Sequence, residues 1–202
     1  ARHYDAAVDT IFEIGGQDSK FVSVRDGRIA DFTMNKICAA GTGSFLEEQA
    51  WEMGIDILGG FARHAFAATA PRDLGSRCTV FMETEVVNAL QAGVPLADIC
   101  GGLAYAIARN YLERVMGNRP LGEHIVFQGG VASNDAVVAA FTRVLDRPIR
   151  VHPYNRLSGA IGAARAAREA RVDGQAARFR GLVPGPPPVL QAFECEQCEN
   201  RC

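Results

Sequence analysis

Short apolar runs that end in glycine pairs alternate along this chain with longer stretches of helical periodicity. The runs Thr10–Ile14 and Ile125–Phe127 each lead into a Gly-Gly pair, which is typical of a strand entering a tight turn. Asp26-Gly27 separates two further apolar runs, and this dipeptide predicts a β-hairpin. The remaining strand candidates are the two arms of that hairpin, 21–24 and 28–33, and Ile149–His152.

Apolar residues recur at intervals of three and four in the segments between these strands, which predicts helices. The clearest helix covers Leu96–Met116, and Ser133 or Asn134 is placed to cap another over Ala136–Leu145. Further helices are predicted over 45–53, over 80–90 and over 157–170. The order of elements predicts an α/β domain with a mixed sheet and helices on its faces.

The chain is expected to hold one domain and an appendage. Residues 1–172 form the predicted domain, 173–192 a stiff Pro-rich linker, and 193–202 a Cys-rich tail that begins a further domain. The chain starts without Met and stops on Cys202, which indicates a piece of a longer protein.

Composition narrows the class of protein. The formal net charge of -2 over 202 residues gives no reason to expect a nucleic acid or an anionic membrane surface as a partner. No apolar run is long enough to span a bilayer, and the N-terminus is not a signal peptide, so we expect a cytoplasmic protein. In that setting six cysteines favour metal or cluster ligation over disulfides.

Two glycine-rich turns are candidates for phosphate binding. Gly15-Gly16 would let backbone N–H groups approach phosphate oxygens, with Gln17 to orient water and Asp18 to hold Mg²⁺ through water. Two glycines alone would favour a simple turn into a hairpin, but the carboxamide, the carboxylate and Lys20 that follow them favour phosphate binding.

The second turn, Gly129-Gly130, precedes Asn134 at a predicted helix start, where a nucleoside or phosphate can bind. Glycine in such a turn often serves packing only. Two turns of this kind in one domain favour the nucleotide interpretation.

Cys38 and Cys78 each stand just before a predicted helix, where the helix N-terminus stabilises a thiolate. The alternative is a pair of buried structural thiols. An iron–sulfur cluster usually takes four thiolates, so the simplest completion is the same pair from a second subunit. Cys100 lies on an apolar stripe and is predicted to be a core residue.

The tail contains a C-x2-C-x3-C array, which indicates a metal or cluster site with a missing ligand, or else a disordered tail. The array consists of Cys195, Cys198 and Cys202.

In combination and order, several motifs resemble one family closely. The resemblance covers roughly 10–170 and is to the activator ATPases of 2-hydroxyacyl-CoA dehydratases and the ATPase subunits of benzoyl-CoA reductase, the BadF/BadG/BcrA/BcrD type. The motifs that carry it are Ile14-Gly15-Gly16-Gln17-Asp18-Ser19-Lys20, Cys38-Ala39-Ala40-Gly41-Thr42-Gly43-Ser44-Phe45-Leu46, Cys78-Thr79-Val80-Phe81, Gly129-Gly130-Val131-Ala132-Ser133-Asn134 and Ser158-Gly159-Ala160-Ile161-Gly162-Ala163-Ala164.

The resemblance implies the fold of actin, hexokinases and heat-shock ATPases, with this chain as the second lobe, a ribonuclease H-like mixed sheet. It implies a homodimer that shares one [4Fe-4S] cluster held by Cys38 and Cys78 of each subunit. ATP or ADP with Mg²⁺ would drive a low-potential electron to a 2-hydroxyacyl-CoA dehydratase or related reductase. Ferredoxin or flavodoxin would supply the electron.

The chain departs from the family pattern in two places. The family often has Lys directly before its first cluster cysteine, where Ile37 stands here, and Asp is common in place of Glu13. The Asp-x-Gly-rich phosphate loop of the first lobe is missing from this sequence, so we expect the chain alone to hydrolyse ATP poorly or not at all.

Two other functions fit part of the pattern. A sugar or amino-sugar kinase of the same superfamily would carry no cluster. A non-catalytic redox or dimerisation module would keep the lobe without using its nucleotide site.

Overall fold

The computed structural model describes residues 1–35, 41–76 and 78–171, together with residues 185 and 189. The chain divides into two compact units, 1–165 and 166–202, and the architecture below belongs to the first. The predicted linker and tail fall almost entirely outside the described residues. Four predicted ligands also lie outside them: Cys38, Cys195, Cys198 and Cys202.

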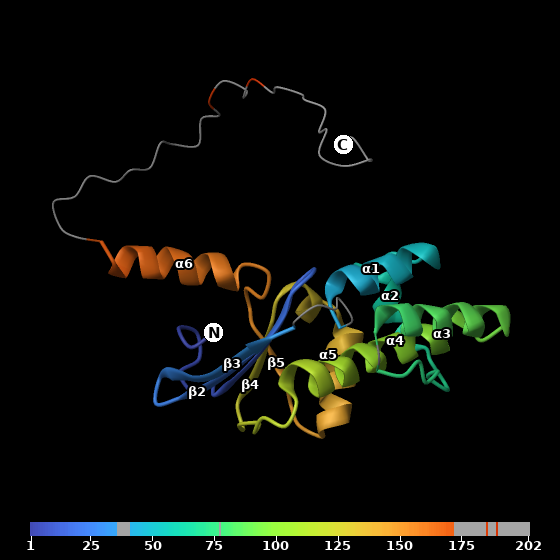
Figure 1. The fold of residues 1–202 in the computed structure, drawn as a ribbon, viewed down its shortest axis with the longest axis horizontal. Helices are drawn as coiled ribbons and strands as arrows, with labels where there is room; N and C mark the ends of the chain where they lie inside the picture. The colour runs from blue at the N-terminus through green and yellow to red at the C-terminus, as the bar shows by residue number, and fades with distance from the viewer. Residues whose placement is uncertain (36–40, 77, 172–184, 186–188, 190–202) are drawn as a thin grey trace, which may run out of the picture. The chain divides into compact units, whose positions relative to one another are not determined.

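A mixed sheet of five strands forms the centre of the first unit, in the order β3-β2-β1-β4-β5 (Figure 1). β1 pairs antiparallel with β2 and parallel with β4, and this mixture confirms the predicted α/β class. At the predicted hairpin turn Asp26 and Gly27 have φ of 51° and 78°. The strands are β1 Thr10–Ile14, β2 Ser19–Arg25, β3 Arg28–Met34, β4 Ile125–Gln128 and β5 Arg150–Val151.

Among the described residues, five α-helices follow the predicted periodicity and a sixth is additional. The short helix α2 was not predicted, since its apolar pattern spans only two turns. None of the described helices has the length and apolar character needed to cross a bilayer. The helices are α1 Gly43–Glu52, α2 Gly60–Phe66, α3 Thr79–Gln91, α4 Leu96–Asn110, α5 Asp135–Leu145 and α6 Ser158–Glu169.

The long predicted helix changes its winding near its end. α4 continues directly into a π-helical turn, η1 Tyr111–Met116, and Gly117 then ends it with a φ of 60°. A 3-10 turn, η2 Gly130–Ser133, precedes α5. Asn134 is the cap of α5, because its side chain accepts from the N–H groups of Ala136 and Val137.

An aromatic cluster joins α4, η1 and α5 to one face of the sheet. The ring of Phe12 on β1 lies 5.0 Å from Tyr111 and 5.5 Å from Phe141, and Phe127 on β4 lies 5.3 Å from Phe141. All four side chains are fully buried. Burying each of them contributes about 1.5–3 kcal/mol, so this cluster fixes the two helices on the sheet.

The segment between α2 and α3 is fastened to the start of α4. The carboxylate of Asp98 accepts hydrogen bonds from Thr69 N (2.9 Å) and Ala70 N (2.8 Å), and its carbonyl accepts from Arg72 N (2.9 Å). Gly102 lies one turn further on, where any Cβ would overlap the Arg72 carbonyl. The segment that leads to Cys78 therefore follows the surface of α4.

We expect Asp98→Ala to destabilise the fold by about 1–3 kcal/mol, because it removes two part-buried hydrogen bonds from backbone N–H groups, each worth about 0.5–1.5 kcal/mol. Urea unfolding measures the change. Asp135→Ala is the matched control, since Asp135 is exposed in the first turn of α5 and its loss removes only a helix-dipole contribution of about 0.3–1 kcal/mol. An equal loss of unfolding free energy in the two variants would contradict the role of Asp98 as the acceptor that holds this segment.

Candidate functional site

The two predicted glycine turns lie side by side because their strands are neighbours. β1 and β4 run parallel with Phe12 opposite Phe127, so Gly15 and Gly129 both follow strand ends at the same edge of the sheet. Gly129 has a φ of 93°, and a Cβ there would overlap the backbone of Ile14. Only glycine allows the second turn to lie this close to the first strand.

The N-terminus of α1 is attached to the first turn. Gly43 N donates to the Gly15 carbonyl at 2.8 Å, and Ser44 N donates to the Gly16 carbonyl at 2.7 Å. A Cβ on Gly43 would lie 3.0 Å from the Gly15 oxygen and 3.1 Å from Val131 Cγ2. The helix start, the first turn and the second turn therefore form one tightly packed unit.

The second turn is held by residues that follow β5. Asn155 makes two hydrogen bonds to Gly129: its backbone carbonyl accepts from Gly129 N at 2.9 Å, and its side-chain Nδ2 donates to the Gly129 carbonyl at 2.9 Å. The same amide donates to Ser133 Oγ at 2.7 Å, and Arg156 Nε donates to that oxygen at 3.0 Å. These bonds position Arg156 beside the turn.

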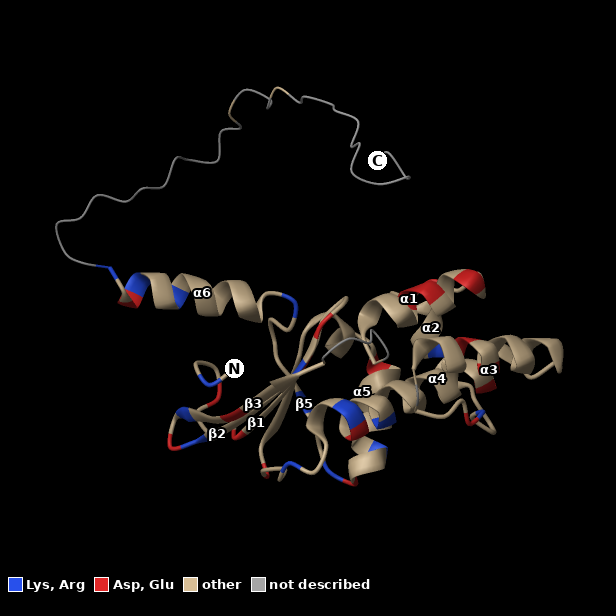
Figure 2. Ribbon diagram, viewed as in Figure 1, with Lys and Arg blue, Asp and Glu red and all other residues tan. Residues whose placement is uncertain are grey.

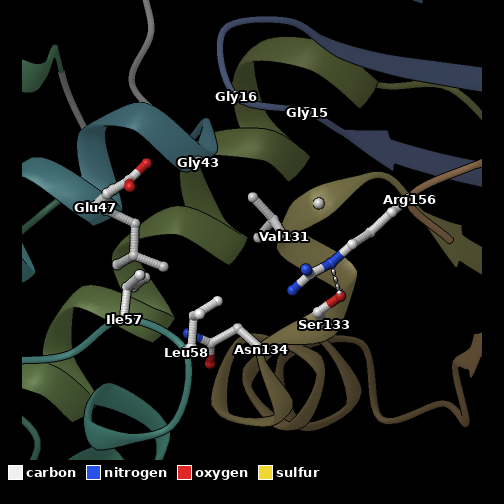
Figure 3. A pocket seen from close by; sticks show the side chains of 12 residues that line it. Gly15, Gly16, Gly43, Glu47, Ile57, Leu58, Val131, Ser133, Asn134 and Arg156 are labelled. Atoms are coloured by element: carbon white, nitrogen blue, oxygen red, sulfur yellow. Dashed lines mark hydrogen bonds between the residues drawn. The ribbon is translucent and has the colours of Figure 1, made fainter.

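A cavity of about 410 Å³ opens in front of these turns (Figure 3). This volume is in the range of small-molecule sites. Glu47 and Arg156 approach the cavity from opposite sides, and Leu58 and Asn134 lie toward the end away from Gly15 and Gly16. Its lining consists of Gly15, Gly16, Gly43, Leu46, Glu47, Ile57, Leu58, Gly130, Val131, Ser133, Asn134 and Arg156.

Asn134 has a donor that the described residues do not satisfy. Its Oδ1 accepts from Ala136 N (3.1 Å) and Val137 N (3.4 Å), so Nδ2 is turned away from the helix. The residue is only 9% exposed, and Nδ2 finds no partner among the described residues. A buried amide donor without a partner costs free energy unless a ligand in the cavity accepts its hydrogen bond.

The cavity brings together four of the predicted nucleotide residues, with Gly129 directly behind them, and leaves out the two predicted catalytic ones. Gln17 and Asp18 lie on the exposed tip of the first turn and do not line the cavity. The tip is shaped by Gly15 N, which donates to the Asp18 carbonyl at 2.8 Å. The Lys20 amine lies 2.8 Å from Glu13 and 4.0 Å from Asp18.

Four lining residues escaped the sequence analysis because they come from other parts of the chain: Glu47, Ile57, Leu58 and Arg156. Glu47 lies one turn into α1, Ile57 and Leu58 precede α2, and Arg156 follows β5. Glu47 alone had a sequence signal, since it lies four residues after Gly43 and so on the same side of α1. Ile57, Leu58 and Arg156 had none.

Cys78 and Cys100 are the two cysteines among the described residues, and they differ in exposure to solvent. Cys78 is exposed and is the N-cap residue of α3, as predicted. Cys100 is fully buried, and this burial raises the pKa of its thiol to about 11, which fits the predicted core role. No group of three metal-ligating side chains occurs within the described part of the chain.

Apolar side chains are exposed along α3 beside Cys78. The helix buries Met82, Val86 and Ala89, and it carries no Lys or Arg (Figure 2). The exposed apolar side chains on it are Val80, Phe81, Val87 and Leu90.

The segments next to both predicted cluster cysteines contact one buried side chain, Asn110. Its amide donates to the carbonyl of Ser76, two residues before Cys78, at 2.8 Å. On its other side is Gly41, three residues after Cys38, where a Cβ would lie 2.9 Å from Asn110 Oδ1.

Relatives and solved structures resemble most of the described chain. The activator of lactoyl-CoA dehydratase from Anaerotignum propionicum is 41% identical over 167 residues, which are 80% of this chain and 62% of the relative. The structure of the Acidaminococcus fermentans (R)-2-hydroxyglutaryl-CoA dehydratase component A matches with a TM-score of 0.76 at 33% identity, covering 81% of this chain and 62% of that one.

A third similar protein was solved with a nucleotide analogue. The activator of the 2-hydroxyisocaproyl-CoA dehydratase from Clostridium difficile, with bound ADPNP, matches with a TM-score of 0.71 at 30% identity, covering 84% of this chain and 66% of that one. This chain thus spans less than two thirds of the length of each of the three.

The fold is therefore that of the actin-like activator ATPases, as the resemblance implied. The model of one family matches residues 2–167, nearly the whole described part. The chain belongs to the BadF/BadG/BcrA/BcrD ATPase family.

Proposed function

We propose that the cavity binds ATP or ADP with Mg²⁺, with the phosphates at Gly15-Gly16 and the base near Leu58 and Asn134. Glycines without Cβ atoms suit phosphate oxygens, whereas Ile57 and Leu58 offer apolar surface for a planar base. The unpartnered Asn134 amide supports a base with a hydrogen-bond acceptor. A relative with bound ADPNP supports the same ligand class.

In this arrangement Gln17 and Asp18 project from the tip of the first turn, next to the phosphate end. A carboxamide there orients an attacking water, and a carboxylate holds Mg²⁺ through water. Both side chains are exposed and so are accessible to a phosphate group that extends beyond the cavity.

We further propose that the protein is an ATP-dependent activase of a 2-hydroxyacyl-CoA dehydratase or a related reductase. The observation that carries this proposal is the exposed thiol of Cys78 at the start of a helix in the same domain as the nucleotide cavity. A sugar kinase of this superfamily has no use for such a thiol. The printed functions of the relatives support the same partner class.

We propose that the protein holds a [4Fe-4S] cluster shared between two subunits. Each chain would supply Cys78, which the structure describes, and Cys38, which lies outside the described residues, as two of the four thiolates. The exposed apolar side of α3 suits a second copy of the chain. Such a cluster supplies a one-electron carrier, which ferredoxin or flavodoxin would reduce. A second site at Cys195, Cys198 and Cys202 stays a prediction.

Replacing Asn134 by Asp tests the nucleotide site. The carboxylate still caps α5, so stability to urea should change little, but the amide donor is lost. One hydrogen bond is worth about 0.5–1.5 kcal/mol, so ADP binding measured by calorimetry should weaken about 2- to 13-fold. Asn134→Ala, which also removes the cap, should lower both affinity and stability. Unchanged affinity in both variants would place the ligand elsewhere.

The cluster ligands are tested by anaerobic iron and sulfide analysis of Cys38→Ser and Cys78→Ser. Each change removes two of four thiolates from a dimer, so iron and sulfide should fall to background. Cys100→Ala is the control, because it removes a buried thiol and should keep the wild-type iron content. A cluster that survives in both serine variants rules out the assignment. Reduction of the cluster independently of nucleotide would instead favour the non-catalytic module.

The dimer surface is tested by Val80→Glu. Val80 is 63% exposed in the first turn of α3, where an acidic residue suits the helix dipole, so the folded monomer should stay stable. A buried charge at the contact should shift sedimentation from dimer to monomer. Val144→Glu replaces an exposed valine on α5 and should leave the dimer intact. A Val80→Glu dimer of wild-type affinity would exclude this side of α3.

A further inference from the structure

Asn110 is a polar side chain in an unusual position at the end of α4. It is only 3% exposed and is the last residue of a helix whose buried residues are mostly apolar. Its Nδ2 donates to the Ser76 carbonyl at 2.8 Å, and its Oδ1 faces the Cα of Gly41. The side chain therefore fills the space between two segments that lie 34 and 69 residues away in sequence.

The segment that begins at Gly41 connects Asn110 to the glycine turn of the nucleotide cavity. Gly41 has a φ of 86°, and a Cβ there would lie 2.9 Å from Asn110 Oδ1. Two residues later, Gly43 N and Ser44 N donate to the carbonyls of Gly15 and Gly16. Residues 41–44 thus have one end against Asn110 and the other on the predicted phosphate turn.

On the other side of Asn110, Ser76 stands two residues before Cys78. The segment before α3 is tied to the same helix by two further contacts, Ser76 Oγ to Glu113 Oε2 at 2.6 Å and Arg109 to Asp73 at 3.1 Å. Both of these contacts are exposed and are weakened by solvent. Asn110 contacts the Ser76 carbonyl through its Nδ2 and lies against Gly41 through its Oδ1, so this side chain touches both segments.

The helix that carries Asn110 is held firmly on the sheet. Tyr111, the next residue, is fully buried and donates from its hydroxyl to the Lys20 carbonyl on β2 at 2.7 Å. Burial raises the pKa of this hydroxyl well above its usual value, so it stays a neutral donor. The π-helical turn begins here, and such turns occur frequently at functional sites.

We propose that Asn110 is a positioning residue that couples the nucleotide turn to the Cys78 segment. A shift of Gly15 and Gly16 on nucleotide exchange would move residues 41–44, and the Asn110 amide would pass this shift to Ser76 and the start of α3. The inference rests on the proposed nucleotide site, and it assigns the contact through which that site controls the thiol.

Hydrogen–deuterium exchange of residues 73–82, with and without ADP, tests this coupling in the full chain. Coupling between two sites typically changes the equilibrium at one site by a factor of about 5 to 150. We therefore expect ADP to change the wild-type exchange rate of this segment at least about fivefold. Asn110→Asp keeps the side-chain shape but loses the donor to Ser76. We expect it to bind ADP with an affinity within about twofold of wild type and to lose the ADP-dependent difference.

Arg109→Ala is the matched control. It removes the Asp73 ion pair from the same segment and helix without touching Gly41, so exchange should quicken in both states while the ADP-dependent difference remains. If Asn110→Asp does not fold by circular dichroism, Gly41→Ala tests the same contact from the other side and should also lose the difference.

Three results would overturn the inference. An Asn110→Asp protein that keeps the full ADP-dependent difference shows that the shift travels elsewhere. A wild-type protein that binds ADP by calorimetry but shows no difference has a nucleotide site without this coupling. A wild-type protein that does not bind ADP at all removes the proposed nucleotide function, and the inference with it.

Discussion

The parallel pairing of β1 with β4 is the constraint on which the rest of this site depends. It sets the ends of the two strands next to each other, so two short turns from distant parts of the chain share one edge of the sheet. The second turn lies so close to the end of β1 that Gly129 contacts the backbone of Ile14. A side chain at Gly129 would force the strands apart and open the cavity that the two turns share.

α4 and its π-helical extension organise the other half of the domain. The aromatic contacts of Tyr111 fix this helix on the sheet, and hydrogen bonds from its first turn and its last residues fasten the segment that precedes α3. The exposed thiol of Cys78 is thus held by a rigid element although it lies at the surface. The proposed role of Cys78 as a thiolate ligand needs this combination of accessibility and fixed position.

Placement of α3 shows where a sequence pattern stops being informative. Periodicity predicts the helix correctly from the apolar residues Val80, Phe81, Val86, Val87 and Leu90. It does not say which apolar side faces the core, because α3 is apolar on more than one side. Packing against α4 buries Met82, Val86 and Ala89, and the other apolar residues are left at the surface.

Local sequence was sufficient for the strands, the hairpin, the choice of Ser133 or Asn134 as a helix cap, and the glycine turns, because each depends on backbone preferences over a few residues. The family motifs also follow from sequence alone. Only the tertiary structure decided that Glu47, Leu58 and Arg156 line the cavity while Gln17 and Asp18 do not. These contacts depend on strand order and helix packing, which join residues far apart in the chain and leave no local pattern.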